Sequence, residues 1–249
     1  IDDNNSLDIY GSPTEGVDGA IGTTYQINSS SDYFISENSY PTTLQGSSSK
    51  SISAWAQINT KNGDGDGVSA FAGFGAASSC TSGSFALSYT TEQSLDDPRF
   101  VSCGDDLVGG SSWNVNEWHH MVSTYDGTNV VLYIDGVEVG SEAKTLYTDT
   151  FFDHVAVGVD PWWSATYHYL THGLVDEVKL YDYALTASDV EDLYELNEIP
   201  DADGSTSDRA STSCLDILND GYSTGDNNYW LDPDGTGAFE AYCLMDTTY

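Results

Sequence analysis

The chain has 249 residues, and its 40 acidic residues against 6 basic ones give a formal net charge of −34. Binding to phosphate backbones and to anionic membranes depends on Lys and Arg, so neither nucleic acid nor an anionic lipid surface is an expected partner. The acidic side chains repel one another. We therefore expect the protein to work in a medium where salt or divalent cations screen this repulsion. No run of about 18 apolar residues is present, so no membrane span is expected. The chain begins at Ile1 rather than Met, which is typical of a processed or trimmed product.

Short apolar runs separated by Gly, Asp, Asn and Ser predict many strands. The predicted strands are 51–58, 68–74, 84–90, 99–103, 118–125, 129–135, 152–159 and 173–181. This pattern, with almost no helical periodicity, indicates an all-β sandwich or barrel. One helix is predicted after Thr186, a suitable N-cap, with Asp189 at its third position and an apolar stripe of Val190, Leu193 and Tyr194.

A three-strand antiparallel meander is predicted at "EWHHMVSTYDGTNVVLYIDGVEVG", residues 117–140. Its two Asp-Gly pairs supply the positive φ that tight hairpin turns need. The pair His119 and His120 is a candidate for metal binding or acid–base chemistry. Adjacent residues of a strand point to opposite faces, however, so one ring is expected to pack inward and the other to face water.

The meander resembles the core of laminin-G-like domains of the concanavalin A-like superfamily. "SISAWAQIN" (51–59) is similar to the family's early strand, and "GLVDEVKLYDYALTASDVEDLYE" (173–195) to its closing strand and terminal helix. The resemblance implies a two-sheet antiparallel jelly roll over residues 1–196, with one short helix near its C-terminal end. Many relatives bind sugars, proteins or calcium, and some members of the superfamily are glycoside hydrolases.

The N-terminus departs from the family's pattern, in which a strand precedes an Asp- and Gly-rich turn. "IDDNNSLDIYGS" is similar to that turn alone. We therefore expect the opening strand to be missing or supplied from elsewhere. An unpaired edge invites another chain, so self-assembly through this edge is a possible partner interaction.

A linker is predicted at 197–213, where Pro, Gly, Ser and Asp replace apolar residues. The segment 214–249 then resembles the opening of fibrinogen-like domains, through its first cysteine, an aromatic strand at Tyr229 and Trp230, "DPDG" and "FEAYCLMD". The rest of that family's pattern is absent. A small appendage that depends on its disulfide or on the sandwich is therefore expected.

The four cysteines are Cys80, Cys103, Cys214 and Cys243. No two have the spacing of a Cys-x-x-Cys metal site. Their even number in a loop-rich acidic chain indicates disulfides and an oxidising, extracellular or cell-surface location. Of the three possible pairings, Cys80–Cys103 with Cys214–Cys243 is favoured, because each bond joins sites within one unit. Asn4 and Asn28 fit the glycosylation sequon.

Calcium is the expected cofactor, and the first candidate site is "NGDGDG". It places Asn62, Asp64 and Asp66 at alternate positions, as in the first half of a calcium-binding loop. Gly73 stands where such a loop would end in Glu, so this is no EF-hand. The alternative interpretation is a solvated acidic hairpin loop.

A second calcium position follows from the family resemblance. Relatives often bind calcium near the rim of the sandwich through the first Asp-rich turn, which here carries Asp2, Asp3 and Asp8. Asp176, with Glu177, is similar to the family's closing "DE" pair. The alternative for Asp176 is a buried structural acceptor of hydrogen bonds.

A candidate ligand site lies in "DPWWSATYHYL", which contains Trp162, Trp163, Tyr167 and Tyr169. Aromatic rings stack on the apolar C–H faces of sugars, and exposed aromatic loops often mark binding sites. The alternative is that these rings cover the core or dock the C-terminal appendage.

From the sequence we expect no enzymatic activity. A retaining glycosidase needs two carboxyls about 5–5.5 Å apart, and the Glu-x-Asp-x-x-Glu strand of the superfamily's glucanases does not occur. No Gly-x-Ser-x-Gly elbow occurs either. We expect an extracellular adhesion or recognition module that binds a glycan or a protein with calcium. The alternatives are a structural subunit of a surface filament or pilus, and a glycoside hydrolase.

Overall fold

The computed structural model describes residues 6–61, 68–75, 83–90, 96–102, 104–110, 112–148, 153–161, 172–196, 204–205, 207, 210–219, 221–233 and 237–245. The chain forms two compact units, Ile1–Glu195 and Leu196–Tyr249. None of the described helices is long and apolar enough to cross a membrane.

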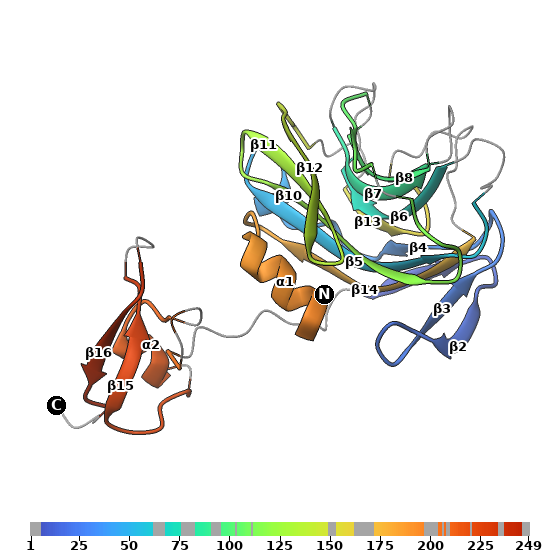
Figure 1. The fold of residues 1–249 in the computed structure, drawn as a ribbon. Coiled ribbons are helices and arrows are strands. Elements are labelled where there is room, and N and C mark those ends of the chain that lie inside the picture. The colour runs from blue at the N-terminus through green and yellow to red at the C-terminus, as the bar shows by residue number, and fades with distance from the viewer. Residues whose placement is uncertain are drawn as a thin grey trace. The chain divides into compact units, whose positions relative to one another are not determined.

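Two antiparallel sheets of seven strands each make up the first unit (Figure 1). In spatial order, sheet 1 contains β1 (Leu7–Tyr10), β4 (Tyr33–Ser36), β13 (Val155–Val157), β6 (Val68–Phe74), β7 (Phe85–Thr90), β8 (Asp97–Val101) and β9 (Leu107–Val108). Sheet 2 contains β12 (Val137–Ala143), β11 (Asn129–Ile134), β10 (Trp118–Tyr125), β5 (Lys50–Ile58), β14 (Gly173–Tyr181), β3 (Thr23–Ile27) and β2 (Thr14–Asp18). A single 3-10 turn, Thr42–Leu44, precedes β5 within the described part of this unit. The predicted all-β jelly-roll sandwich is confirmed.

Alternation along the strands builds the core between the sheets. On β5, Ile52, Ala54 and Ile58 face inward and are fully buried, while Ser51 and Ser53 lie on the opposite face. Each fully buried isoleucine contributes about 1.5–3 kcal/mol. The period of two in the sequence therefore corresponds to the division between the core and the outer face of sheet 2.

The predicted helix is confirmed as α1 (Ala187–Leu196). The Asp189 N–H donates to Thr186 Oγ1 at 3.2 Å, and the Thr186 N–H donates to Asp189 Oδ2 at 2.8 Å. These reciprocal bonds satisfy two backbone donors at the start of the helix. Val190 and Leu193 are buried, and the ring of Tyr194 stacks on Trp55 with centroids 5.7 Å apart. The helix therefore covers part of the outer face of sheet 2.

The two adjacent histidines lie on opposite faces of β10, as predicted, but neither ring faces water. His120 is fully buried under α1, with Nε2 2.9 Å from Ser53 Oγ. His119 is 17% exposed, stacks on Trp113 and places Nδ1 2.7 Å from Asp135 Oδ2. The expectation of one solvated ring is wrong because a helix covers the face that the strand pattern assigns to solvent.

The N-terminal segment is not a turn alone. Leu7–Tyr10 forms β1, which pairs with β4 in the register Leu7↔Ser36 and Tyr10↔Tyr33. This finding corrects the expectation that an opening strand is missing, although residues 1–5 lie outside the described part. The edge strands β1 and β2 are largely exposed and only four and five residues long, so they carry little of the apolar alternation that marks longer half-buried strands.

The second unit contains α2 (Cys214–Asn219) and a hairpin of β15 (Asn227–Leu231) and β16 (Phe239–Cys243). The predicted Cys214–Cys243 disulfide is present, with Cα atoms 5.5 Å apart. Its small core consists of Ile217, Tyr229, Leu231, Cys243 and Met245. Cys80 and Cys103, the other predicted pair, lie outside the described residues.

Basic side chains in the described part bind acceptors within the fold. Lys144 is almost fully buried and donates to Asp105 at 2.9 Å and to Glu142 at 3.0 Å. Arg99 pairs with Asp106 at 3.1 Å. Further ion pairs join Lys61 to Asp96 at 2.5 Å and Lys179 to Glu177 at 3.3 Å. Lys50 is buried as well and binds a carbonyl and a hydroxyl.

Candidate functional site

The described residues that flank the two predicted ligand segments lie at the same end of the sandwich. Gly173, at the start of β14, pairs with Ile58 at the end of β5 and with Ile27 at the end of β3. The Asn59 N–H donates to the His172 carbonyl at 2.8 Å. The described residues Asn59 and His172, close to the segments 62–67 and 162–171, are therefore neighbours, and we call this part of the sandwich the loop end.

Most predicted site residues lie outside the described part of the chain. These are the calcium candidates Asn62, Asp64, Asp66, Asp2 and Asp3, the aromatic candidates Trp162, Trp163, Tyr167 and Tyr169, and the sequon residue Asn4. Among the described residues, no group of three or more His, Cys, Asp or Glu side chains is placed to hold a metal ion. Calcium binding by the predicted loops stays a prediction.

Asp96 organises the described side chains at the loop end. It accepts hydrogen bonds from Lys61 Nζ at 2.5 Å and from the Tyr89 hydroxyl at 2.6 Å. Burial acts to raise the pKa of Asp96, but the hydrogen bonds from Lys61 and Tyr89 outweigh it and lower this pKa. The Tyr89 oxygen also accepts from the Trp113 N–H at 3.0 Å. This network ties together described residues that follow β5, lie on β7 and precede β8.

Three buried polar atoms at the loop end have no hydrogen-bond partner among the described residues: Asn59 Oδ1, Trp113 Nε1 and His119 Nε2. Since His119 Nδ1 is paired with Asp135, its Nε2 is the nitrogen left to accept. Buried polar groups normally find a protein or water partner. Ordered water would satisfy these atoms.

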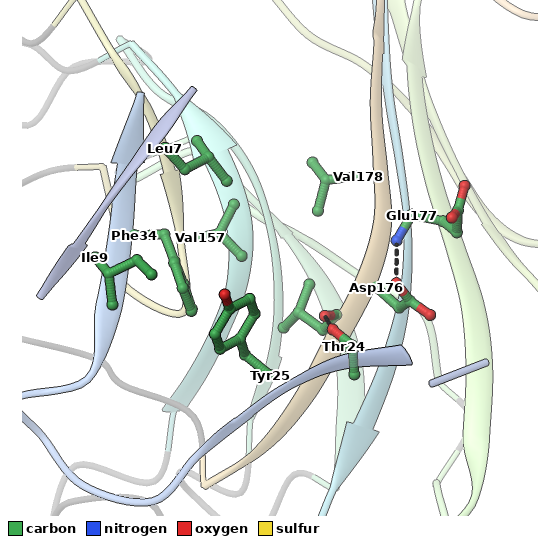
Figure 2. A pocket seen from close by; sticks show the side chains of 10 residues that line it. Leu7, Ile9, Thr24, Tyr25, Phe34, Val157, Asp176, Glu177 and Val178 are labelled. Atoms are coloured by element: carbon green, nitrogen blue, oxygen red, sulfur yellow. Dashed lines mark hydrogen bonds between the residues drawn. The ribbon is translucent and has the colours of Figure 1, made fainter. Parts of the chain in front are cut away.

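A separate pocket of about 270 Å³ lies at one lateral edge of the sandwich (Figure 2). Sheet 1 contributes side chains from β1, β4 and β13, and sheet 2 contributes side chains from β3 and β14. The lining residues are Leu7, Ile9, Thr24, Tyr25, Phe34, Val157, Val175, Asp176, Glu177 and Val178. We call this the edge pocket, and its lining is mainly apolar.

Asp176, the described member of the predicted calcium set, lies at the rim of the edge pocket. Its carboxylate accepts from the Ile21 N–H at 3.1 Å and from the Glu177 N–H at 3.0 Å. Burial raises the pKa of Asp176 in spite of these bonds. Glu177 has a φ of +49° within a β-bulge and pairs with Lys179. The carboxylate therefore holds the turn between β2 and β3 against β14.

Asn28 is exposed at the end of β3. Its Nδ2 donates to Thr14 Oγ1 at 2.9 Å and to the Gln26 carbonyl at 3.3 Å. The position is open to solvent, but the amide that a glycan would modify is engaged in hydrogen bonds. Glycosylation at Asn28 stays a prediction.

The edge pocket was not predicted from the sequence. The sequence feature that points to this pocket is the alternation of Leu7 and Ile9 with Asp8 and Tyr10, which is typical of a strand with one apolar face. Four residues are too few for this signal to stand out beside the Asp-rich segment that precedes them.

Two facing seven-stranded antiparallel sheets and a short terminal helix define the class of concanavalin A-like sandwiches. The chain belongs to the Laminin_G_3 family, described as the concanavalin A-like lectin/glucanases superfamily, whose profile matches residues 28–191. This match covers more than half of the chain. No curated protein sequence matches it.

Solved structures with a similar fold include binding domains. Domain 4 of AbnA, an extracellular GH43 arabinanase from Geobacillus stearothermophilus solved in complex with arabinotriose, is 22% identical with a TM-score of 0.57, covering 77% of this chain and 88% of that one. The binding domain of Paraclostridial Mosquitocidal Protein 1 is 16% identical with a TM-score of 0.60, covering 79% and 48%. The binding domain of botulinum neurotoxin serotype D is 13% identical with a TM-score of 0.58, covering 78% and 46%. The chain thus spans less than half of the two toxin domains. At these identities the likeness shows the fold.

Proposed function

We propose that the sandwich is an extracellular recognition module that binds a glycan, or a protein, at its loop end with the help of calcium. The observation that carries this proposal is the pairing of Gly173 with Ile58, together with the Asn59–His172 hydrogen bond. These contacts join described residues that lie close in sequence to the acidic segment and to the aromatic segment. The similar fold of a domain solved with arabinotriose supports a carbohydrate ligand.

The residue types in these two segments suit sugar binding. Trp and Tyr rings offer a flat apolar surface to the C–H face of a sugar. Asn62, Asp64 and Asp66 supply oxygen ligands of the kind that calcium prefers, and the flanking glycines let the backbone turn its carbonyls toward an ion. The proposed calcium affinity is modest, about 10⁻⁴–10⁻³ M, because no bidentate acid ends the loop.

A glycan array with calcium and with EDTA tests the ligand. The wild type is expected to bind a defined set of glycans, the Trp162→Ala/Trp163→Ala variant to lose that binding, and a Tyr147→Ala control to retain it. Tyr147 is an exposed aromatic in the described part, outside both segments. Equal binding by all three proteins would show that the aromatic segment is not the site.

Calcium titration tests the cofactor. The Asp64→Asn/Asp66→Asn variant is expected to bind one ion fewer than the wild type, whereas Asp182→Asn, at an exposed position, leaves the stoichiometry unchanged. An unchanged stoichiometry and affinity in the double variant would identify this segment as a solvated acidic turn.

The proposal assigns no catalysis to the chain. Family membership alone leaves a glycoside hydrolase open, because the superfamily includes glucanases. Release of reducing sugar from the glycans that bind is the discriminating assay. We expect none, and measurable turnover would replace the binding proposal by the enzymatic one.

We propose that the second unit is the opening part of a fibrinogen-like fold. The Cys214–Cys243 disulfide and the hairpin that carries Tyr229 and Trp230 support this proposal. An assembly role, as a filament or pilus subunit, is the second candidate function. Concentration-dependent polymers in sedimentation at high salt would favour it over a monomeric module.

A further inference from the structure

The strand β1 has an open edge. It is the last strand of sheet 1, and β4 is its one partner among the described strands. The Glu37 N–H donates to the Ser6 carbonyl at 2.9 Å, just before β1 begins. Hydrogen-bonding direction alternates along an antiparallel strand, so every second residue from Ser6 onward faces β4. The backbone N–H and C=O groups of Leu7 and Ile9 therefore point away from the sheet.

The same two residues line the edge pocket with their side chains. Figure 2 shows Leu7, Ile9 and Phe34 on one side of the pocket and Val178 on the other. Ile9 faces inward and is nevertheless 53% exposed. An inward-facing isoleucine of a sandwich is normally covered. The free backbone edge and the uncovered apolar surface thus coincide at one strand.

The opposite lateral edge of the sandwich is closed. A Cβ placed on Gly109, next to β9, would lie 2.8 Å from Val139 Cγ2 of β12. A Cβ on Gly140 of β12 would lie 3.4 Å from Leu107 Cδ1 of β9. The two sheets therefore approach each other closely on that side, and the opening at β1 is a local feature.

Acidic side chains surround the open edge. Asp8 is exposed on β1, and Glu15 on β2 accepts a hydrogen bond from Tyr25 of the pocket. Asp176 lies at the rim, and the neighbouring Lys179 is already paired with Glu177. A second copy of this chain, with its net charge of −34, would meet strong repulsion here. The charge therefore favours a cationic occupant.

We propose that the β1 edge binds an extended, basic segment of a partner protein by strand addition. The segment pairs with the backbone of Leu7 and Ile9, inserts apolar side chains into the edge pocket, and turns the alternate Lys or Arg side chains toward Asp8, on the opposite face of β1. Strand addition of this kind takes affinity from main-chain hydrogen bonds and specificity from pockets for alternate side chains. An apolar cavity of about 150 Å³ already holds benzene, so a pocket of about 270 Å³ has room for one or two large aliphatic side chains. This site is distinct from the loop end and does not rest on the proposed function.

The probe is a blocked seven-residue peptide that alternates lysine and isoleucine. We expect it to bind the full chain, to weaken as NaCl rises, and to slow hydrogen exchange at the amides of Leu7 and Ile9 by about tenfold or more. A peptide with glutamate in place of lysine is expected to bind at least about tenfold more weakly. A peptide methylated on the backbone nitrogens of one edge keeps the charge and the side chains. Its affinity is nevertheless expected to fall by a similar factor, because it loses main-chain hydrogen bonds.

Two variants with the same change of charge locate the site. Ile9→Lys places a cation at the open edge and is expected to abolish binding of the lysine peptide. Val137→Lys makes the same change on β12, where Val137 is 64% exposed, and is expected to bind like the wild type. Thermal unfolding of both variants confirms that they fold, since both positions are largely exposed.

Several results would overturn the proposal. Equal binding of the methylated peptide, or equal losses in Ile9→Lys and Val137→Lys, would show nonspecific attraction to an acidic surface. Protection of Leu7 and Ile9 that grows with protein concentration, without peptide, would identify a second copy as the occupant. Glycan binding at the loop end is unaffected by any of these results, so the failure of either proposal is recognised separately.

Discussion

Lys50 donates hydrogen bonds from its buried Nζ to the Thr148 hydroxyl and to the Gly46 carbonyl, each at 2.8 Å. Its side chain has no exposed surface, and none of the ion pairs among the described residues includes it. Both acceptors are neutral, so the ammonium has lost water without gaining a carboxylate. Burial therefore lowers the pKa of Lys50 from 10.5 to about 8.

The free energy of unfolding is expected to rise between pH 8 and pH 10. The folded pKa of Lys50 lies below the unfolded one, so the unfolded chain binds more protons in this window and stability increases with pH. The full shift corresponds to an upper limit of about 3 kcal/mol, at about 1.4 kcal/mol per pKa unit. Burial raises the pKa of Tyr181 to about 12, which opposes the trend above pH 10.

Urea unfolding at pH 8.0, 8.75 and 9.5 measures this slope. Lys50→Met is expected to lack the rise, while Lys179→Met, a partly exposed and paired lysine, is expected to keep it. A slope in Lys50→Met equal to that of the wild type would mean that the ammonium has access to water in the folded protein.

His120 is expected to destabilise the fold at acidic pH. Burial under α1 lowers its pKa to about 4 from the usual 6.5. The pKa of His120 is lower in the folded protein than in the unfolded chain. The contribution of the neutral ring to the free energy of unfolding is therefore fully present above pH 6.5 and is lost as the pH falls toward 4. The difference in unfolding free energy between the wild type and His120→Gln should change by up to about 3 kcal/mol from pH 7 to pH 4. His154→Gln serves as the control at a less buried histidine, and an identical pH profile for both variants would contradict the assignment.

The cap of α1 is expected to contribute measurably to the sandwich. Thr186→Ala removes the acceptor of the Asp189 N–H and should lower the unfolding free energy by about 0.5–2 kcal/mol. Ser188→Ala, an exposed position in the first turn, should change it by less than about 0.5 kcal/mol. Near-UV circular dichroism reports whether Trp55, which packs against Tyr194, loses its fixed environment. A loss no larger than that of Ser188→Ala would show that the helix end is satisfied by water.

The disulfide of the second unit is expected to hold that unit together. Cys214 and Cys243 are 29 positions apart, and closing such a loop stabilises by about 3–4 kcal/mol in the chain-entropy model. The core beside it has few residues. Limited proteolysis of Cys214→Ala/Cys243→Ala should therefore cut within Leu196–Tyr249 and leave the sandwich intact. Resistance equal to that of the wild type would show that the small core suffices.

The parts of the fold that could be predicted are those with a repeated local signal. The strand 118–125 and the turns at Asp126 and Asp135 have the expected bounds, because alternation and Asp-Gly pairs are both short-range features. The helix after Thr186 follows from a cap and an apolar stripe in the same way. The edge strands β1 and β2 could not be predicted, since they bury little and are too short, at four and five residues, for an alternation to stand out.

The sites depend more on tertiary contacts. The edge pocket unites side chains from five strands, including Leu7, Phe34, Val157 and Val178, and no window of sequence contains them together. His120 and Lys50 look like ordinary polar strand residues, and only the helix or loop packed over them makes them buried. Asp176 could be singled out from its motif. Its hydrogen bonds to the Ile21 and Glu177 amides could not be predicted, because Ile21 is far from Asp176 in the sequence.

The few basic side chains have a consequence for how this protein meets others in solution. Five of the six basic residues are described, and each is engaged inside the fold, with the side chains of Lys144 and Arg99 only 1% and 13% exposed. An approaching molecule therefore encounters a field of one sign from almost every direction. Cationic partners are drawn in faster than diffusion alone would bring them, by a factor that falls with ionic strength, while identical copies keep their distance. At low ionic strength the protein therefore favours cationic partners already during diffusional encounter, before specific contacts form.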